Sequence, residues 1–156
     1  MQKITEAVAK QLQLKGWRLA TAESCTGGWV AKACTDLAGS SNWFEHGVVT
    51  YSNEAKMHYL QIPCDVLEAH GAVSQEVVEA MVAGLLLLPR VDVAVAVSGI
   101  AGPGGGSAEK PVGLVWLAWA CAGKVQSASY VFDGDRNSVR EQAVNVALQG
   151  VLSITE

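Results

Sequence analysis

Hydrophobic residues recur along this chain either at helical spacing or in the short continuous runs of buried strands. Near the N-terminus, Ile4, Val8 and Leu12 lie four residues apart and predict a helix that ends at Gly16. The run Val-Asp-Val-Ala-Val-Ala-Val at 91–97 is rich in β-branched residues and predicts a central buried strand. Similar patterns predict strands at 17–22, 44–51, 112–121 and 125–132, and helices at 28–37, 53–59, 75–88 and 137–154.

Capping and turn residues set several of these boundaries. Ser74 is the predicted N-cap of the helix at 75–88, and Pro89 ends that helix. Asn53 is the predicted N-cap of the helix that begins there. Gly-Lys at 123–124 separates two strand patterns and predicts a β-hairpin, and the glycine cluster at 102–106 predicts a mobile loop.

Helical and strand patterns alternate along the chain, which favours an α/β fold. We expect one domain over residues 1–156, a three-layer α/β/α sandwich around a mixed, mostly parallel five-stranded sheet. Half of the residues are hydrophobic and 17% are charged, which argues against disorder. The apolar stretches are too short for a membrane span and the N-terminus lacks a signal-peptide pattern, so we expect a cytoplasmic protein without a membrane partner.

Charge and cysteine usage narrow the function classes. The net charge of −4 and the absence of a basic run argue against a nucleic-acid partner. The four cysteines form no CxxC pair and have no histidine at ligand spacing, so neither a metal site nor a cofactor is expected. In a cytoplasmic protein these cysteines stay reduced.

Clusters of glycine and hydroxyl residues follow two of the predicted strands. Thr-Ala-Glu-Ser-Cys-Thr-Gly-Gly at 21–28 joins a strand to a helix, where backbone N–H groups are free to bind an anion or an oxyanion. Ser-Gly-Ile-Ala-Gly-Pro at 98–103 follows the central strand. Because ligands of such sheets collect at the carboxyl ends of parallel strands, we expect the two loops to share one pocket.

These segments, with others along the chain, resemble the CinA C-terminal domain family, and within it the stand-alone nicotinamide-nucleotide amidases. The matching segments are Ala-Glu-Ser-Cys-Thr-Gly-Gly at 22–28, Gly-Ser-Ser at 39–41, Gly-Val-Val-Thr-Tyr-Ser-Asn-Glu-Ala-Lys at 47–56, Gly-Ala-Val-Ser at 71–74, Ser-Gly-Ile-Ala-Gly-Pro at 98–103, Lys-Pro-Val-Gly at 110–113 and Gly-Asp-Arg at 134–136. Family members often have threonine at Ser98, so the hydroxyl is kept. The resemblance implies hydrolysis of the carboxamide of nicotinamide mononucleotide, and it also allows a binding-only regulatory paralogue without amidase activity.

The resemblance points to Ser24, Ser41, Tyr51, Lys56 and Ser98 as pocket residues. Our hypothesis takes Ser41 as the nucleophile and Lys56 as its general base, with Ser24 and Tyr51 orienting the pair or relaying a proton. A rival hypothesis places the nucleophile at Ser24. Either way, Lys56 must be buried, because a lysine with the ordinary pKa of about 10.4 is almost entirely protonated at pH 7.

Substrate contacts are expected around the same loops. Arg136 is the first candidate for the substrate phosphate, with Arg140 in reserve, because a guanidinium group binds phosphate oxygens in a forked geometry. Trp43 is expected either to stack on the pyridine ring or to lie at a subunit contact of a homodimer. The other candidate substrate-binding residues are Glu23, Thr26, Gly27, Gly28, Ser98, Gly99 and Gly102.

Overall fold

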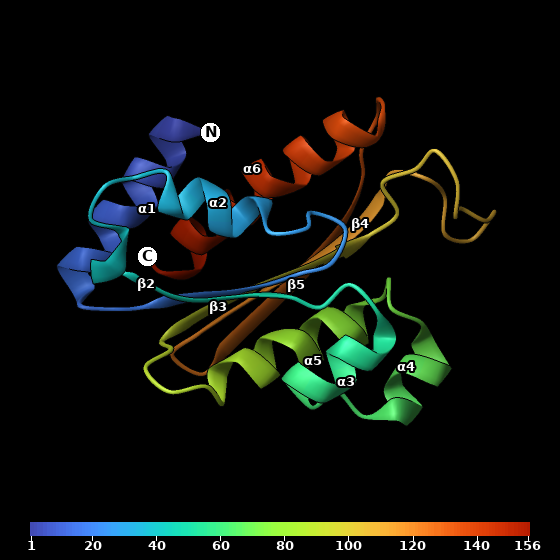
Figure 1. The fold of residues 1–156 in the computed structure, drawn as a ribbon, viewed down its shortest axis with the longest axis horizontal. Helices are drawn as coiled ribbons and strands as arrows, with labels where there is room; N and C mark the ends of the chain where they lie inside the picture. The colour runs from blue at the N-terminus through green and yellow to red at the C-terminus, as the bar shows by residue number, and fades with distance from the viewer.

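A five-stranded sheet forms the middle layer of the computed structural model, which describes residues 1–156. The strands lie in the order β2-β1-β3-β4-β5; β1 pairs in parallel with β2 and β3, while β4 pairs antiparallel with β3 and β5. Helices α1, α2 and α6 cover one face of the sheet and α3, α4 and α5 cover the other (Figure 1). The strands are β1 Leu19–Glu23, β2 Phe44–Val49, β3 Val93–Gly99, β4 Leu114–Cys121 and β5 Lys124–Val131. The helices are α1 Gln2–Lys15, α2 Trp29–Thr35, α3 Asn53–Leu60, α4 Cys64–His70, α5 Gln75–Leu86 and α6 Arg136–Ile154, with a short 3-10 turn at Ser40–Asn42.

The central strand β3 explains how two cores form on the two faces. Its valines Val93, Val95 and Val97 join the core beneath α1, α2 and α6, whereas Ala94 and Ala96 join the core beneath α5. All five are buried, as predicted for a strand covered on both sides. The alternation of large and small side chains follows the two-residue period of the strand and lets α5 approach the sheet closely.

Most predicted elements are present, and the differences have local causes. Helix α3 begins at Asn53, but its N-cap is Ser52, whose Oγ accepts a hydrogen bond from Ala55 N at 3.0 Å, so the prediction of Asn53 as the cap was wrong. Ser74 caps α5 as predicted, and this helix ends at Leu86, two residues before the predicted end. Helix α4 was missed, because its seven residues bury one side chain, Leu67, and therefore show no periodicity.

Trp43 lies in the hydrophobic core, not at the surface. Its side chain is 1% exposed, and its ring meets that of Phe44 edge to face at a centroid distance of 6.3 Å. It therefore cannot stack on a substrate ring or form a subunit contact in this conformation, and both expectations for it were wrong.

The parallel direction of β1, β2 and β3 brings the loops that follow them together at one end of the sheet. The strands β1, β2 and β3 are parallel, with Glu23 opposite both Val49 and Val97, so their carboxyl ends lie side by side. The loops that follow these strands, and the start of α6, gather at that end (Figure 1). None of the helices has both the length and the hydrophobicity needed to span a bilayer.

Candidate active site

Ser24 and Lys56 meet at the carboxyl ends of the parallel strands. Ser24 directly follows β1, and Lys56 lies on α3, which follows β2. The Lys56 Nζ is 3.2 Å from the Ser24 Oγ, and it also donates to the carbonyl oxygens of Thr50 at 2.8 Å and Tyr51 at 3.4 Å. Lys56 is only 1% exposed, and no carboxylate lies within ion-pair distance of its amine. A buried amine is thus held against a serine hydroxyl by neutral oxygen atoms alone.

Burial changes the acid–base behaviour of this lysine. Desolvation of the ammonium form lowers the pKa of Lys56 below its ordinary value of 10.5. When the amine is neutral, its lone pair can accept the proton of the Ser24 hydroxyl at the observed separation. The structure therefore meets the physical demand that general-base chemistry places on a lysine.

The carboxylate next to Ser24 is directed away from Lys56. Glu23 is 1% exposed, and its two carboxylate oxygens accept hydrogen bonds from Val30 N at 2.8 Å and Ala31 N at 3.0 Å, at the start of α2. From the sequence, we expected these N–H groups at the start of α2 to be free to bind an anionic ligand. That expectation was wrong at these two positions, because the protein's own carboxylate occupies them. Glu23 anchors the Ser24 loop and is not exposed to a substrate.

Other backbone N–H groups of the loop remain free. The amides of Cys25, Thr26 and Gly28 have no hydrogen-bond acceptor within the chain, whereas that of Gly27 donates to Ser24 O at 3.0 Å. Gly27 and Gly28 both have left-handed backbone conformations, with φ of 62° and 94°, which let the chain turn sharply between β1 and α2. Free amides within four residues of a nucleophile are suitable donors to an oxyanion.

Arg140 holds this loop from α6. Its Nε donates to Cys25 O and its Nη2 to Thr26 O, both at 3.0 Å, and its guanidinium carbon lies 5.3 Å from the centre of the Trp29 ring. An open cavity of about 420 Å³ adjoins the loop, lined by Thr26, Gly27, Gly28, Trp29, Lys32 and Arg140. Arg140 therefore holds the loop at 24–28 in shape, and its Nη1 alone is left without a partner in the chain.

Arg136 and Tyr51 also meet at the carboxyl ends of the parallel strands. The Arg136 Nη2 lies 3.2 Å from the Tyr51 hydroxyl, and its Nη1 donates to Gly102 O at 2.8 Å. Both side chains are exposed, and Tyr51 retains 60% of its surface. The contact joins the start of α6, the segment after β2 and the glycine loop after β3, three of the segments that the sequence assigned to one pocket.

Ser98, Gly99 and Gly102 have mainly structural contacts. Ser98 is 1% exposed, and its Oγ donates to Ala72 O at 2.8 Å, which ties β3 to the segment before α5. A side chain at Gly99 would collide with Val115 on β4. Of the three residues, Gly102 alone contacts a residue that is expected to bind the substrate, because its carbonyl oxygen accepts a hydrogen bond from Arg136.

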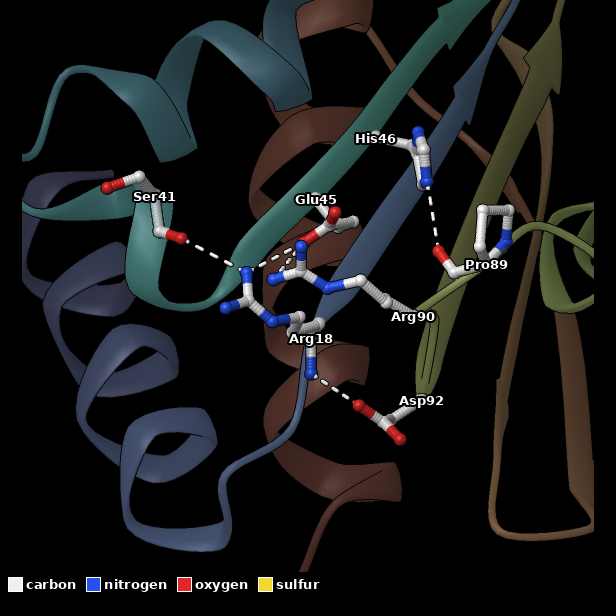
Figure 2. Close-up of polar contacts among 7 residues, drawn as sticks. All are labelled: Arg18, Ser41, Glu45, His46, Pro89, Arg90 and Asp92. Carbon is white, nitrogen blue, oxygen red and sulfur yellow. Dashed lines mark hydrogen bonds and ion pairs between the residues drawn. The ribbon is translucent and has the colours of Figure 1, made fainter.

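Ser41 lies at the opposite end of the parallel strands, just before β2 begins. It belongs to the 3-10 turn before β2, and its carbonyl oxygen accepts a hydrogen bond from Arg18 Nη1 at 3.1 Å (Figure 2). Lys56 comes after β2, so the length of a six-residue strand, about 20 Å, separates the two side chains. The structure contradicts the predicted Ser41–Lys56 pair within one chain and brings Ser24 to Lys56 instead.

Cys25 is a poor candidate for a nucleophile. Its side chain is 6% exposed, and burial raises the pKa of the thiol to about 11, so the reactive thiolate is scarce at neutral pH. The Thr50 carbonyl, in contrast, is a functional group that sequence reasoning missed. It anchors the Lys56 amine through the backbone, and a backbone contact leaves no signal in the residue type.

Comparison with known proteins adds the family. The model of the CinA C-terminal domain matches residues 1–155. The Nicotinamide-nucleotide amidohydrolase PncC of Escherichia coli K12 is 53% identical over 150 residues, covering 96% of this chain and 91% of that protein. Its namesake from Pseudomonas putida is 55% identical over 137 residues, covering 88% and 86%. The crystal structure of the competence/damage inducible protein CihA from Agrobacterium tumefaciens superposes with a TM-score of 0.97 at 41% identity, covering 99% of this chain and 95% of that one. The chain belongs to the CinA C-terminal domain family.

Proposed function

We propose that this protein hydrolyses the carboxamide of nicotinamide mononucleotide to nicotinic acid mononucleotide and ammonia, with Ser24 as the nucleophile and Lys56 as the general base. The observation that carries the mechanism is the buried Lys56 amine, 3.2 Å from the Ser24 Oγ and without an acidic partner. The substrate class comes from the PncC relatives, whose name specifies a nicotinamide-nucleotide amidohydrolase.

In the first half of the reaction, neutral Lys56 accepts the hydroxyl proton as the Ser24 Oγ bonds to the carboxamide carbon. The carbonyl π-electrons move to oxygen, and the free amides of Cys25, Thr26 and Gly28 are the donors that this loop offers to the oxyanion. When the tetrahedral intermediate collapses, the C–N bond breaks and the Lys56 ammonium gives its proton to the nitrogen, which leaves as ammonia. The product of this half-reaction is an ester between Ser24 and the carboxyl group of nicotinic acid mononucleotide, with the ribose phosphate still attached.

In the second half, water takes the place of the serine hydroxyl. Lys56 is neutral again after ammonia leaves, so it can remove a proton from a water molecule that attacks the ester carbon. The Ser24 Oγ then departs with that proton, and the free carboxylate of nicotinic acid mononucleotide remains. Such a product can re-enter the synthesis of NAD.

The substrate phosphate is assigned to Arg136. Its guanidinium group is exposed at the same edge of the sheet, and neither of its hydrogen-bond acceptors, Gly102 O and the Tyr51 hydroxyl, is a carboxylate. Its positive charge is therefore available to an anionic ligand. Tyr51 orients the guanidinium group and can add its own hydroxyl to the phosphate.

The decisive experiment measures ammonia release from nicotinamide mononucleotide by the wild type, Ser24→Ala, Lys56→Met and Ser41→Ala. We expect Ser24→Ala and Lys56→Met to lose activity by about 10⁴-fold or more. Ser41→Ala is the matched control and should retain it, because Ser41 lies at the far edge of the sheet. Activity in Ser24→Ala together with its loss in Ser41→Ala would refute the assignment.

Wild-type protein that binds the nucleotide without releasing ammonia would instead identify a regulatory paralogue. To separate these outcomes from misfolding, each variant is checked by circular dichroism. Rapid acid quench followed by mass spectrometry should find the acyl group of nicotinic acid mononucleotide on the peptide that contains Ser24.

A further inference from the structure

The glycine loop, residues 102–110, lies between β3 and β4 and is exposed over most of its length. It extends beyond the end of the sheet (Figure 1). Two hydrogen bonds join it to other elements. At its first residue, Gly102 O accepts from Arg136 Nη1 at 2.8 Å, and at its last residue, Lys110 Nζ donates to His70 O at 2.7 Å. The loop is therefore held at both ends.

The Lys110 contact is built by the residues around it. His70 is the last residue of α4, where carbonyl groups lack a helical partner and the helix dipole favours a cation. Ser107 fixes the backbone of Lys110, because its Oγ accepts from Lys110 N at 3.0 Å and its N–H donates to Lys110 O at 2.8 Å. A Cβ atom at Gly71 would lie 3.1 Å from Lys110 Nζ, so the amine packs against the backbone there. Lys110 is thus part of a defined contact between the glycine loop and α4.

The two halves of the glycine loop pack closely against each other at its base. A Cβ atom at Gly102 would lie 2.5 Å from Val112 Cγ1, and one at Gly106 would lie 2.7 Å from Val112 N. Next to this contact, Gly113 N donates to Ile100 O at 2.7 Å. Such close backbone contacts leave little space for one half to move without the other. A contact at the Lys110 end therefore also restrains the position of the Gly102 carbonyl group.

The Gly102 carbonyl group orients the guanidinium group of Arg136. Gly102 O and the Tyr51 hydroxyl together use two of its five N–H groups, so three remain for a phosphate. Arginine has a long side chain, and a ligand that must first order such a side chain binds less tightly. An Arg136 that is already oriented in the free protein therefore binds an anion at a smaller entropic cost.

We propose that Lys110 is a positioning residue for the substrate phosphate: it holds the glycine loop so that Gly102 O orients Arg136. This inference rests on the proposed assignment of the phosphate to Arg136. Lys110 acts through the loop and does not itself contact the substrate. Its loss should weaken the binding of phosphate-bearing nucleotides and leave the chemical step at Ser24 unchanged.

The test is a double-mutant cycle, with the Kd of nicotinic acid mononucleotide measured by isothermal titration calorimetry. This nucleotide is the product, so no turnover disturbs the measurement. We expect Lys110→Met to raise Kd by about 3- to 10-fold in the wild-type background and by less than about 2-fold in the Arg136→Ala background. A direct attraction between the lysine charge and the phosphate would instead raise Kd equally in both backgrounds, and that result would overturn the proposal.

Two further variants complete the binding experiment. Lys110→Arg keeps a cationic donor and should restore most of the affinity. Lys124→Met is the matched control, because Lys124 is exposed in the hairpin between β4 and β5, near the start of β3 and away from the glycine loop. It should bind the nucleotide as the wild type does, and a loss equal to that of Lys110→Met would count against a specific role for Lys110.

Steady-state kinetics separates positioning from a general loosening of the site. Lys110→Met should raise KM for nicotinamide mononucleotide with kcat and the urea midpoint unchanged, whereas a fall in kcat of the same size would show that the loop supports the chemistry and would refute the proposed role. Failure of the two proposals is distinguishable. Wild-type protein that binds no nucleotide would overturn the phosphate assignment itself, and binding that depends on Arg136 but not on Lys110 would overturn this inference alone.

Discussion

Replacing Lys56 with methionine should alter the pH dependence of stability in a direction that the structure fixes. Methionine keeps the length of the four-atom aliphatic stem but removes the amine that is buried without an acidic partner. In the wild type, burial lowers the pKa of Lys56, whereas in the unfolded chain the pKa returns to its ordinary value of about 10.4. Unfolding between these two pKa values therefore takes up a proton.

The sign and the size of the effect follow from this proton uptake. Below the lowered pKa, the amine is protonated in both states, and the wild type bears the full cost of a buried charge. As pH rises toward 10.4, the folded amine is neutral while the unfolded amine is still charged, so the free energy of unfolding increases. The steepest possible gain from one group is about 1.4 kcal/mol per pH unit. Lys56→Met cannot make this gain, so its stability relative to the wild type should fall as pH rises.

Urea denaturation at a series of pH values measures the difference between the two proteins. Lys3→Met is the control, because Lys3 is exposed on α1 and forms no hydrogen bond or ion pair there, and it should follow the wild-type curve. The activity of the wild type should rise over the same pH range in which Lys56 loses its proton. Parallel stability curves for Lys56→Met and the wild type would show that Lys56 titrates normally, and would refute its role as a base.

Three further changes test other parts of the site and the fold. Arg136→Ala should raise KM for nicotinamide mononucleotide by about 10- to 100-fold, since a charged hydrogen bond contributes about 1.5–3 kcal/mol, while steady-state kinetics with the phosphate-free riboside should show no change. Glu23→Gln replaces an acceptor of two buried N–H groups with a neutral amide, and urea denaturation should show a loss of about 1–3 kcal/mol. Gly150→Ala should destabilise by about 1–3 kcal/mol in the same assay despite the helix preference for alanine, because the added methyl would overlap the buried Trp119 indole; an unchanged midpoint would show that the indole can move.

The sequence predicted the layers of this fold well, because the relevant signals are local. The β-branched run at 91–97 and the cap at Ser74 each depend on neighbouring residues, and both predictions agree with the structure. Helix α4 escaped prediction because one buried side chain cannot establish a period. At α3, the adjacent residues Ser52 and Asn53 are both good caps, and only the backbone geometry distinguishes them.

The site was harder to predict, because its composition depends on whether each residue precedes or follows its strand. Sequence reasoning preferred Ser41 as the nucleophile and kept Ser24 as the rival, because their residue types and neighbouring glycines do not distinguish them. The parallel pairing of β1 with β2 places the residue after β1 beside the segment after β2, so Ser24 lies next to Lys56. Ser41 precedes β2 and so lies at the other edge of the sheet. The paired hydroxyl and amine are a product of topology, which a single sequence does not display.

The fold also directs the buried Glu23 away from Lys56, although the two residues lie close together at the end of β1. Successive residues of β1 point to opposite faces: Ala22 joins the core beneath α5, whereas Glu23 bonds to the start of α2 on the other side. Lys56 comes from α3, which covers the same face of the sheet as α5 (Figure 1), and it forms no ion pair with Glu23. An ion pair between them would hold the lysine in its charged form and raise its pKa. Because helix N–H groups satisfy Glu23, Lys56 is left with neutral acceptors only, as its proposed role as a base requires.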